Sequence, residues 1–303
     1  MLLTYLRLLL TAFFWAGVFH LGQIAVTLMS PLGAAAWRFA IAGLLFLPSV
    51  AWREGWDFTG LRRNAGVLTV MAVVGVFGFN VGLFYGLQTT SAMNGALIAA
   101  LNPALTAVFA AAVNRQAPRP GQVLGLLLGL VGVAIVVSRG SLQAILNLHL
   151  STGDAWVMFG ALCWALYTAL PQRYVKGLSS VQVAASTVIG GALLMIAFAL
   201  VVAPDFPVPL PGLQAWAVIA AMAVFGSVIA YLWWNDGIKQ VGPTQAAIFM
   251  NFVPFFAALI SVGRGEHLHE AQVWGGVLVI AGVLCSTFVG RLGAQVRGGG
   301  RQT

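Results

Sequence analysis

Charge is the property that this sequence has least of. Asp, Glu, Lys and Arg make up 7% of its 303 residues, whereas roughly 25% is typical of soluble domains. Hydrophobic residues make up 60% and fall in long blocks separated by short polar breaks. A soluble domain needs a polar surface, which this composition does not supply. The chain is therefore expected to lie in a lipid bilayer for most of its length.

Catalytic and metal-binding motifs are also missing. Cys163 and Cys285 lie inside apolar blocks and form no C-x-x-C or metal-ligand spacing. The chain has no H-E-x-x-H or G-x-S-x-G motif, since 267–270 has its His and Glu residues in the wrong order. We therefore expect no metal, no cofactor and no enzymatic activity. An intramembrane enzyme is the alternative from another functional class.

Ten apolar blocks reach the roughly 20 residues that a spanning helix needs. They predict an all-α polytopic membrane protein, in one transporter domain over 1–290 and with no soluble domain. A short Gly- and Arg-rich cytoplasmic tail, 291–303, is predicted to be disordered. The predicted spans are 5–27, 32–52, 66–87, 91–113, 121–138, 153–172, 179–203, 213–235, 243–263 and 271–290.

The basic residues predict how these spans are oriented. The net charge is +8, and the positive-inside rule explains it better than a nucleic-acid partner does. With the N-terminus inside, 12 of the 15 Lys and Arg residues fall on the cytoplasmic side. Arg139 and Arg264 fall outside, and Arg38 lies within a span. We therefore expect a bacterial inner (plasma) membrane protein with both termini in the cytoplasm and no nucleic acid bound.

The two halves of the chain, 1–148 and 149–290, resemble each other. The stretch from Ala12 aligns with that from Ala161 at an offset of 149, so that Trp15 matches Trp164. Further matches follow in register, and they pair Phe77-Gly78 with Phe225-Gly226, Pro103 with Pro254, and Gly132-Val133 with Gly282-Val283. Each half holds five spans, and an odd number inverts the second half in the membrane. An inverted repeat is typical of secondary transporters with a site near the midplane.

The chain resembles the EamA-type branch of the drug/metabolite transporter superfamily over nearly its whole length. The second half carries the signature at 237–243, Pro254, 265–268, Gly275 and 282–283, and the first half carries the matching Thr90-Ser91-Ala92, Pro103 and Gly132-Val133. The first half departs from the family at Gln116, where a Glu like Glu266 is common. Among these transporters the Trp-rich sequence looks most like the bacterial aromatic amino-acid exporters.

Polar side chains inside the spans are candidate substrate-binding groups, because they are costly in hydrocarbon. Arg38 is a candidate partner for a substrate carboxylate; the alternative is an Arg that snorkels or binds backbone carbonyls. His20 is either a proton relay or a neutral core residue. The candidate amides, which either bind substrate or join helices, are Asn80, Asn94, Asn102 and Asn251.

Aromatic side chains complete the predicted site. Trp15 and Trp164 lie near mid-depth, and Tyr85, Tyr167 and Trp234 are further candidates; packing is the alternative for each. Pro103 and Pro254 are predicted to break their helices at matching places, which is a sequence pointer to the site. No carboxylate lies at mid-depth, which favours neutral or zwitterionic substrates over cations.

The combined prediction is a secondary transporter that exports small neutral metabolites by alternating access about a midplane cavity. Aromatic or large apolar amino acids are the expected substrates. The alternative within transport is a broad exporter of drugs or nucleobase-like compounds. The expected partners are the small-molecule substrate and the lipid bilayer, and the chain is expected to act as a monomer.

Overall fold

The computed structural model describes residues 1–54, 58–90, 92–115, 117–149, 151–208, 212–265 and 269–298, and within these ranges it leaves out the side chains of 49–54, 87, 92–94 and 287–298. Nine helical stretches of the described residues are long and apolar enough to cross a membrane. The apolar segment Glu270–Ser286 is a shorter tenth. The all-α polytopic architecture is therefore confirmed.

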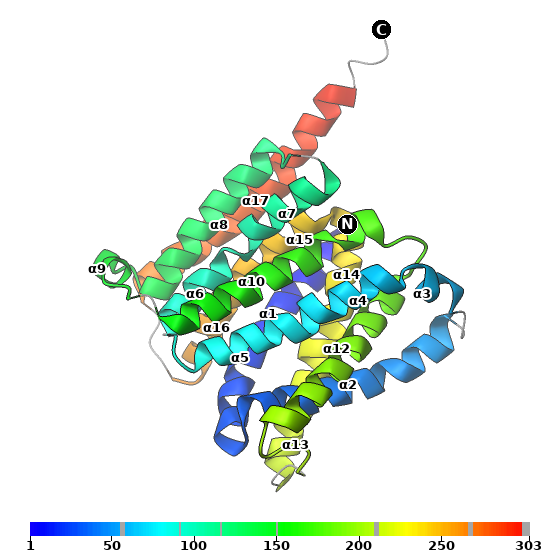
Figure 1. The fold of residues 1–303 in the computed structure, drawn as a ribbon. Coiled ribbons are helices and arrows are strands. Elements are labelled where there is room, and N and C mark those ends of the chain that lie inside the picture. Colours follow the sequence, from blue (N-terminus) through cyan, green and yellow to red (C-terminus); the bar gives the residue numbers. More distant parts are fainter. Residues whose placement is uncertain are drawn as a thin grey trace.

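The first half runs through its helices in chain order (Figure 1). They are α1 (Leu2–Leu28), α2 (Pro31–Glu54), α3 (Thr59–Arg63), α4 (Ala65–Met71), the π-helix η1 (Ala72–Gly78), α5 (Phe79–Leu87), α6 (Ala92–Ala100), α7 (Asn102–Asn114), α8 (Pro120–Ser138) and α9 (Leu142–Leu146). Here α4, η1 and α5 form one continuous span, and α6 and α7 form the next.

The second half repeats this order. Its helices are α10 (Thr152–Ala169), α11 (Pro171–Tyr174), α12 (Ser180–Val202), α13 (Gly212–Ala221), the π-helix η2 (Met222–Ile229), α14 (Ala230–Val241), α15 (Pro243–Ile248), the 3₁₀ helix η3 (Phe249–Asn251), α16 (Phe252–Gly263) and α17 (Glu270–Gly298). One predicted end was wrong, because the eighth span continues to Val241 and not to 235. The helix α17 extends beyond the predicted tenth span to Gly298.

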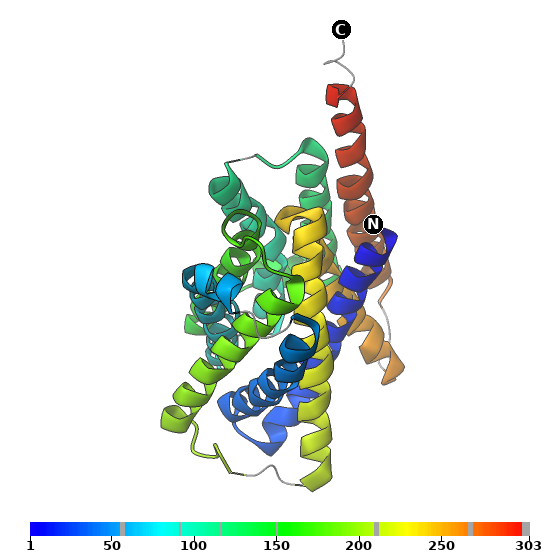
Figure 2. The ribbon, with the colours of Figure 1, turned by 90° about the vertical axis from the view of Figure 1, so that its right-hand side faces the viewer.

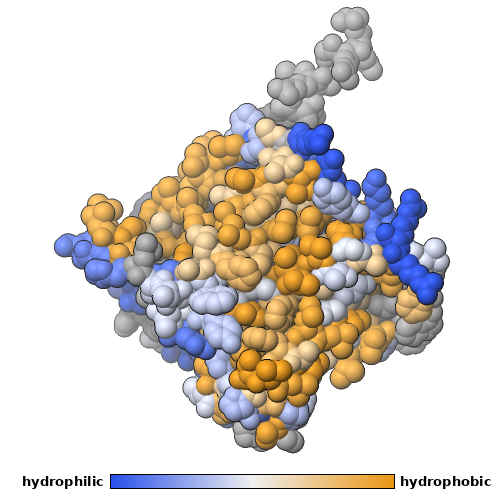
Figure 3. Space-filling view, in the orientation of Figure 1, coloured by the Kyte–Doolittle hydropathy of each residue, from blue (hydrophilic) through white to orange (hydrophobic). Residues whose placement is uncertain are grey.

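The surface fits a bilayer. Apolar residues cover most of the face drawn in Figure 3, and hydrophilic residues gather toward its margins. Many large apolar side chains are exposed along the spans, among them Leu44, Val108 and Leu193. In water such a surface would drive aggregation, whereas acyl chains solvate it.

Close contacts between glycines show that the two halves are inverted. A Cβ atom added to Gly125 would lie 2.5 Å from the carbonyl oxygen of Gly282, and one added to Gly132 would lie 2.7 Å from that of Gly275. Residue numbers rise along α8 as they fall along the facing α17, so the two helices are antiparallel (Figures 1 and 2). At an offset of 150 the two contacts exchange with each other. A pseudo-two-fold axis therefore passes between α8 and α17.

The same axis passes through the middle of the molecule. Gly43 and Ala192 are repeat mates at the offset of 149, and a Cβ atom on Gly43 would lie 3.5 Å from that of Ala192. Trp15 and Trp164, mates at the same offset, also contact each other, with 5.2 Å between their ring centroids. A residue can contact its own repeat mate only close to the symmetry axis. The axis therefore runs between α2 and α12 and through the Trp15–Trp164 pair.

Helix interruptions occur at matching places in the two halves. The π-helices η1 and η2 overlap when an offset of 148 is applied. The fourth span breaks at residue 101, just before Pro103, and the ninth span narrows to η3 before Pro254. A proline removes one helical hydrogen bond and crowds the preceding turn, which accounts for an interruption just before Pro103 and another just before Pro254. The π-helices were not predicted.

Candidate functional site

Five aromatic side chains meet where the two halves touch. We call them the aromatic cluster: Trp15 from α1, Trp164 and Tyr167 from α10, and Tyr231 and Trp234 from α14. Trp15 lies 5.1 Å from Trp234 between ring centroids, and Trp164 stacks on Tyr167 at 5.2 Å. All but the half-buried Trp15 are at most 2% exposed. In this conformation the rings fill the space between the halves.

The π-helices provide backbone carbonyls for this cluster. The Tyr231 hydroxyl donates to the carbonyl of Gly75 in η1 at 3.3 Å, and Trp15 Nε1 donates to that of Gly226 in η2 at 3.1 Å. Gly75 also lets the ring of Tyr167 approach, since a Cβ atom there would lie 2.1 Å from its Cδ2. A π-turn shifts the backbone hydrogen bonds of a helix and is often found at functional sites.

Arg38 on α2 points to the same π-helix. Its Nε donates to Ser227 Oγ at 2.8 Å, its Nη2 donates to the Gly226 carbonyl at 3.1 Å, and its guanidinium lies 4.9 Å from the ring centroid of Phe39. The side chain is 6% exposed, and the described residues give it no carboxylate partner. Arg38 thus binds a backbone carbonyl, as one sequence interpretation held, but its buried charge is left without a counter-ion.

The hydroxyl of Tyr167 lies inside a chain of hydrogen bonds. Asn235 Nδ2 donates to it at 2.7 Å and also donates to the Tyr231 carbonyl at 2.8 Å. The hydroxyl lies 3.5 Å from Thr187 Oγ1, which itself donates to the Val183 carbonyl at 2.8 Å. Tyr167 therefore accepts from Asn235 and donates to Thr187.

The predicted amides divide between backbone and site. Asn80 Nδ2 donates to the Val76 carbonyl in η1 at 2.7 Å, and its side chain also hydrogen-bonds with Tyr231, so it borders the aromatic cluster. Asn102 Nδ2 donates at 3.1 Å to the Ala99 carbonyl, the group that Pro103 leaves without its helical partner. Asn102 thus repairs the break beside it.

Asn251 lies in η3 at the second break. A Cβ atom on Gly129 of α8 would lie 2.0 Å from its Nδ2, so this side chain packs against α8. The Oδ1 atoms of Asn102 and Asn251 are both buried, and no described residue donates to either. Both breaks therefore hold an unsatisfied acceptor, which is unusual for buried polar atoms.

Three predicted residues lie apart from the cluster or cannot be placed. His20 Nε2 is 3.1 Å from the Ala257 carbonyl and its Nδ1 is 3.3 Å from Arg264, so it joins α1 to the end of α16. Tyr85 contacts the exposed Trp156 instead, at 5.5 Å between centroids. The backbone of Asn94 belongs to α6, but its side chain lies outside the described ones.

Two central residues were missing from the predicted site, namely Tyr231 and Asn235. A usable signal was present, because Ser227, Tyr231, Trp234 and Asn235 recur at the i, i+4, i+7, i+8 spacing of one helix face. The run Trp233-Trp234-Asn235-Asp236 reads as the polar end of a span when it is taken as a block.

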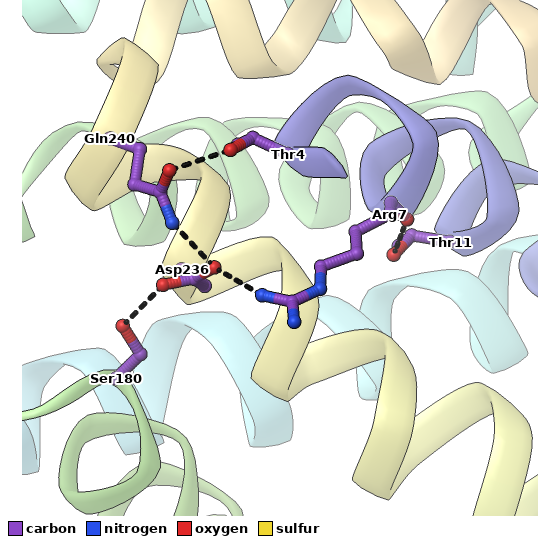
Figure 4. A network of polar contacts seen from close by, with 6 residues as sticks. All are labelled: Thr4, Arg7, Thr11, Ser180, Asp236 and Gln240. Carbon is purple, nitrogen blue, oxygen red and sulfur yellow. Dashed lines mark hydrogen bonds and ion pairs between the residues drawn. The ribbon is translucent and has the colours of Figure 1, made fainter. Parts of the chain in front are cut away.

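A polar network ties the two halves together at the N-terminal end of α1 (Figure 4). Arg7 Nη1 forms an ion pair with Asp236 Oδ2 of α14 at 3.1 Å. Gln240 Nε2 donates to the same carboxylate at 2.8 Å, and Gln240 Oε1 accepts from the Thr4 hydroxyl at 2.6 Å. The Ser180 hydroxyl of α12 donates to the other carboxylate oxygen at 3.4 Å. The first, seventh and eighth spans are thereby held at one end.

Comparisons with known proteins agree with this architecture. The model of the EamA-like transporter family matches residues 2–138 and 151–288. An uncharacterized transporter of Bacillus subtilis, YyaM, is 38% identical over 95% of this chain and 94% of its own length. An uncharacterized transporter of Archaeoglobus fulgidus is 27% identical, over 94% and 97%. The uncharacterized inner membrane transporter YedA of Escherichia coli is 25% identical, over 89% and 86%.

A solved structure shares the fold. It superposes with a TM-score of 0.80 at 20% identity and covers 95% of this chain and 97% of its own. Two family matches that together span nearly every described helix, and a relative at 38% identity over almost the full length, establish the relationship. The chain belongs to the EamA-like transporter family and is a membrane transporter.

Proposed function

We propose that this transporter exports small neutral or zwitterionic metabolites that carry an aromatic or large apolar group, with aromatic amino acids as the leading candidates. The observation that carries the proposal is the aromatic cluster on the pseudo-two-fold axis, where both halves contribute rings. Each ring that stacks on a substrate ring adds about 0.5–1.5 kcal/mol beyond simple burial. A cluster of this kind favours aromatic substrates without strict selection among them.

Charge supports the same class of substrate. Arg38 is buried next to the cluster and has neutral hydrogen-bond partners, so a substrate carboxylate would supply the counter-ion that it lacks. Every Asp and Glu that the structure describes lies near the end of a span or in a connection between spans. A permanent cation would therefore meet Arg38 with no acidic group to offset the repulsion.

The mechanism that we propose is alternating access by movement of one half against the other. The Arg7–Asp236 network closes one end of the first, seventh and eighth spans in this conformation. By the positive-inside rule this is the cytoplasmic end. The aromatic cluster would open to that side when the network breaks, and the inverted halves would then exchange roles.

Direction follows from the lack of a coupling group. With no carboxylate at mid-depth, net flux runs down the substrate gradient, so a metabolite that accumulates inside the cell leaves it. The proposed localisation is the inner membrane with both termini in the cytoplasm, and a single chain holds all the proposed parts.

The experiment is uptake into proteoliposomes that contain the purified full-length chain, with phenylalanine, tryptophan, alanine, adenine and a permanent cation as substrates. We expect saturable flux of phenylalanine and tryptophan that exceeds flux of alanine at equal concentration. Protein-free liposomes give the background. Flux of adenine without any amino acid would favour the nucleobase-like alternative, and flux of the cation alone would overturn the proposed substrate class.

A further inference from the structure

The hydrogen-bond donors of the aromatic cluster are all in use. Trp164 Nε1 donates to Met250 Sδ at 3.1 Å, and Trp234 Nε1 donates to Thr168 Oγ1 at 3.4 Å. As described above, Trp15, Tyr167 and Tyr231 also have acceptors. A ligand that enters the cluster therefore finds no free donor on these five rings.

One acceptor is left over. Asn235 is 4% exposed, and no described residue donates to its Oδ1. The orientation of this amide is fixed, because its Nδ2 faces the carbonyl of Tyr231, which can only accept. Rotating the amide by 180° would bring two oxygens together. A buried carbonyl without a hydrogen-bond donor is destabilising, so this conformation favours a ligand that brings a donor to Asn235 Oδ1.

We propose that Asn235 is a substrate-binding residue whose Oδ1 accepts a hydrogen bond from an ammonium N–H of the substrate. The surroundings suit an ammonium group. Asn235 bonds to the hydroxyl of Tyr167 and to the backbone of Tyr231, two members of the aromatic cluster, and aromatic ring faces attract a desolvated cation. This inference rests on the proposed function, because the substrate reaches Asn235 only when the halves separate.

The position of Asn235 also excludes a simple arrangement. Ser227, which holds Arg38, lies eight residues before Asn235, which is about 12 Å along a helix at 1.5 Å per residue. The carboxylate and ammonium of one α-amino acid are much closer together than this. Two arrangements remain. Either the long Arg38 side chain extends toward Asn235 so that both residues bind one substrate molecule together, or the substrate contacts Arg38 and Asn235 one after the other as it moves through the protein.

The test compares two ligands that share a ring and a carboxylate and differ in the ammonium group, L-phenylalanine and 3-phenylpropanoate. Binding to the purified full-length chain is measured by calorimetry. We expect the wild type to bind phenylalanine about ten- to hundredfold more tightly, as a hydrogen bond to a charged group implies. In Asn235→Leu the ratio should fall close to one.

Two further variants separate this role from a structural one. Asn235→Asp keeps an acceptor oxygen and should retain the preference for phenylalanine. In Asn235→Ser the shorter hydroxyl can still bond to the Tyr231 carbonyl but does not reach the position of Oδ1, so the preference for phenylalanine should be lost. This variant replaces Asn235→Leu if the Leu variant does not fold. The control is Asn64→Leu, since Asn64 is equally buried but has partners for both amide atoms, Gly60 and Lys176.

The outcomes are distinct. An unchanged ratio in folded Asn235→Leu or Asn235→Ser, or equal binding of both ligands to the wild type, would overturn the assignment of Asn235. The expected ratios without any phenylalanine flux in liposomes would support the assignment and refute the proposed function. Failure of the wild type to bind either ligand would overturn both.

Discussion

Trp15 and Trp164 stand 149 residues apart in the sequence and meet edge to face, with their rings at 86° to each other. They are the same position of the two repeats. The pair is nevertheless asymmetric, because Trp164 is 2% exposed and stacks on Tyr167, while Trp15 is half-buried and bonds to the Gly226 carbonyl. The two rings are therefore expected to respond differently to substitution.

Replacing Trp15 should affect transport more than stability. Trp15→Ala should reduce flux of phenylalanine and tryptophan more than flux of alanine, whereas Trp15→Phe, which keeps a ring, should preserve the preference. Trp164→Ala removes a fully packed ring and should also cost about 3–5 kcal/mol of folding free energy. Flux in liposomes with matched protein amounts, together with thermal unfolding in detergent, gives both values. Equal losses for all substrates would mean that these rings only pack the fold.

Gly75→Ala should damage the site through Tyr167. The new methyl group would lie 2.1 Å from the Tyr167 ring, so ring or helix must move; overpacking of this kind costs about 1–3 kcal/mol. Gly17→Ala is the matched control, because α1 leaves a Cβ atom there with no atom of another segment within 4 Å. It should be neutral or stabilising. The measurement is thermal unfolding, and equal behaviour of both variants would contradict the close approach.

Breaking the Arg7–Asp236 pair should favour opening at its end of the molecule. The reporter is Thr168→Cys, placed at a buried position near the C-terminal end of α10, in a background with Cys163→Ala and Cys285→Ala. Asp236→Asn should raise the labelling rate with a small polar thiol reagent by about fivefold at most, because a partly exposed ion pair contributes roughly 0.2–1 kcal/mol.

The control for this prediction is the exchanged pair. Arg7→Asp combined with Asp236→Arg restores opposite charges and should return labelling toward the wild-type rate. Labelling that stays high in the double variant would assign the effect to the other partners of Asp236, namely Gln240 and Ser180.

Stability should fall in acid through Asp205. Burial alone would raise the pKa of this carboxyl, but hydrogen bonds from the hydroxyl and backbone N–H of Ser30 outweigh it, so the pKa lies below its ordinary value. A carboxyl whose pKa is lowered in the folded state stabilises the protein. This stabilisation is fully present above the unfolded pKa of about 4, and it is lost as pH falls through the folded pKa. Asp205→Asn should reduce the dependence of the unfolding temperature on pH between about pH 5 and pH 3, the range around the unfolded pKa. A slope identical to that of the wild type would reject this role.

The topology predicts the sidedness of two reporters. Figure 1 places α9 at the opposite end of the α8–α17 pair from the C-terminal end. A reporter fused after Thr303 should be active on the cytoplasmic side, and one inserted near Gln143 on the other side. Activity of both on one side would contradict ten spans.

The spans and the repeat were open to prediction because each leaves a local mark in the sequence. A spanning helix needs a long apolar block, and a proline such as Pro103 interrupts a helix wherever it falls in a span. The mates Trp15 and Trp164 could be found because duplication preserves sequence register.

The site was harder to predict because it depends on contacts between distant segments. Tyr85 and Tyr167 look alike in sequence, yet Tyr85 meets exposed Trp156 whereas Tyr167 packs on Gly75 in another span. The π-helices have no residue pattern of their own, so the carbonyl that receives Arg38 could not be foreseen. Asn235 was missed because it is the last residue of the predicted span and reads there as part of the polar end.

The reciprocal glycine contacts of α8 and α17 bear on how such a molecule can be assembled from its parts. The two halves contact each other through equivalent surfaces, as the subunits of a two-fold symmetric dimer do. Two separate half-length polypeptides could form this interface only if they were inserted into the membrane in opposite directions. Joining them in one chain removes that requirement. Because the first half has an odd number of spans, the second half enters the membrane with the opposite orientation.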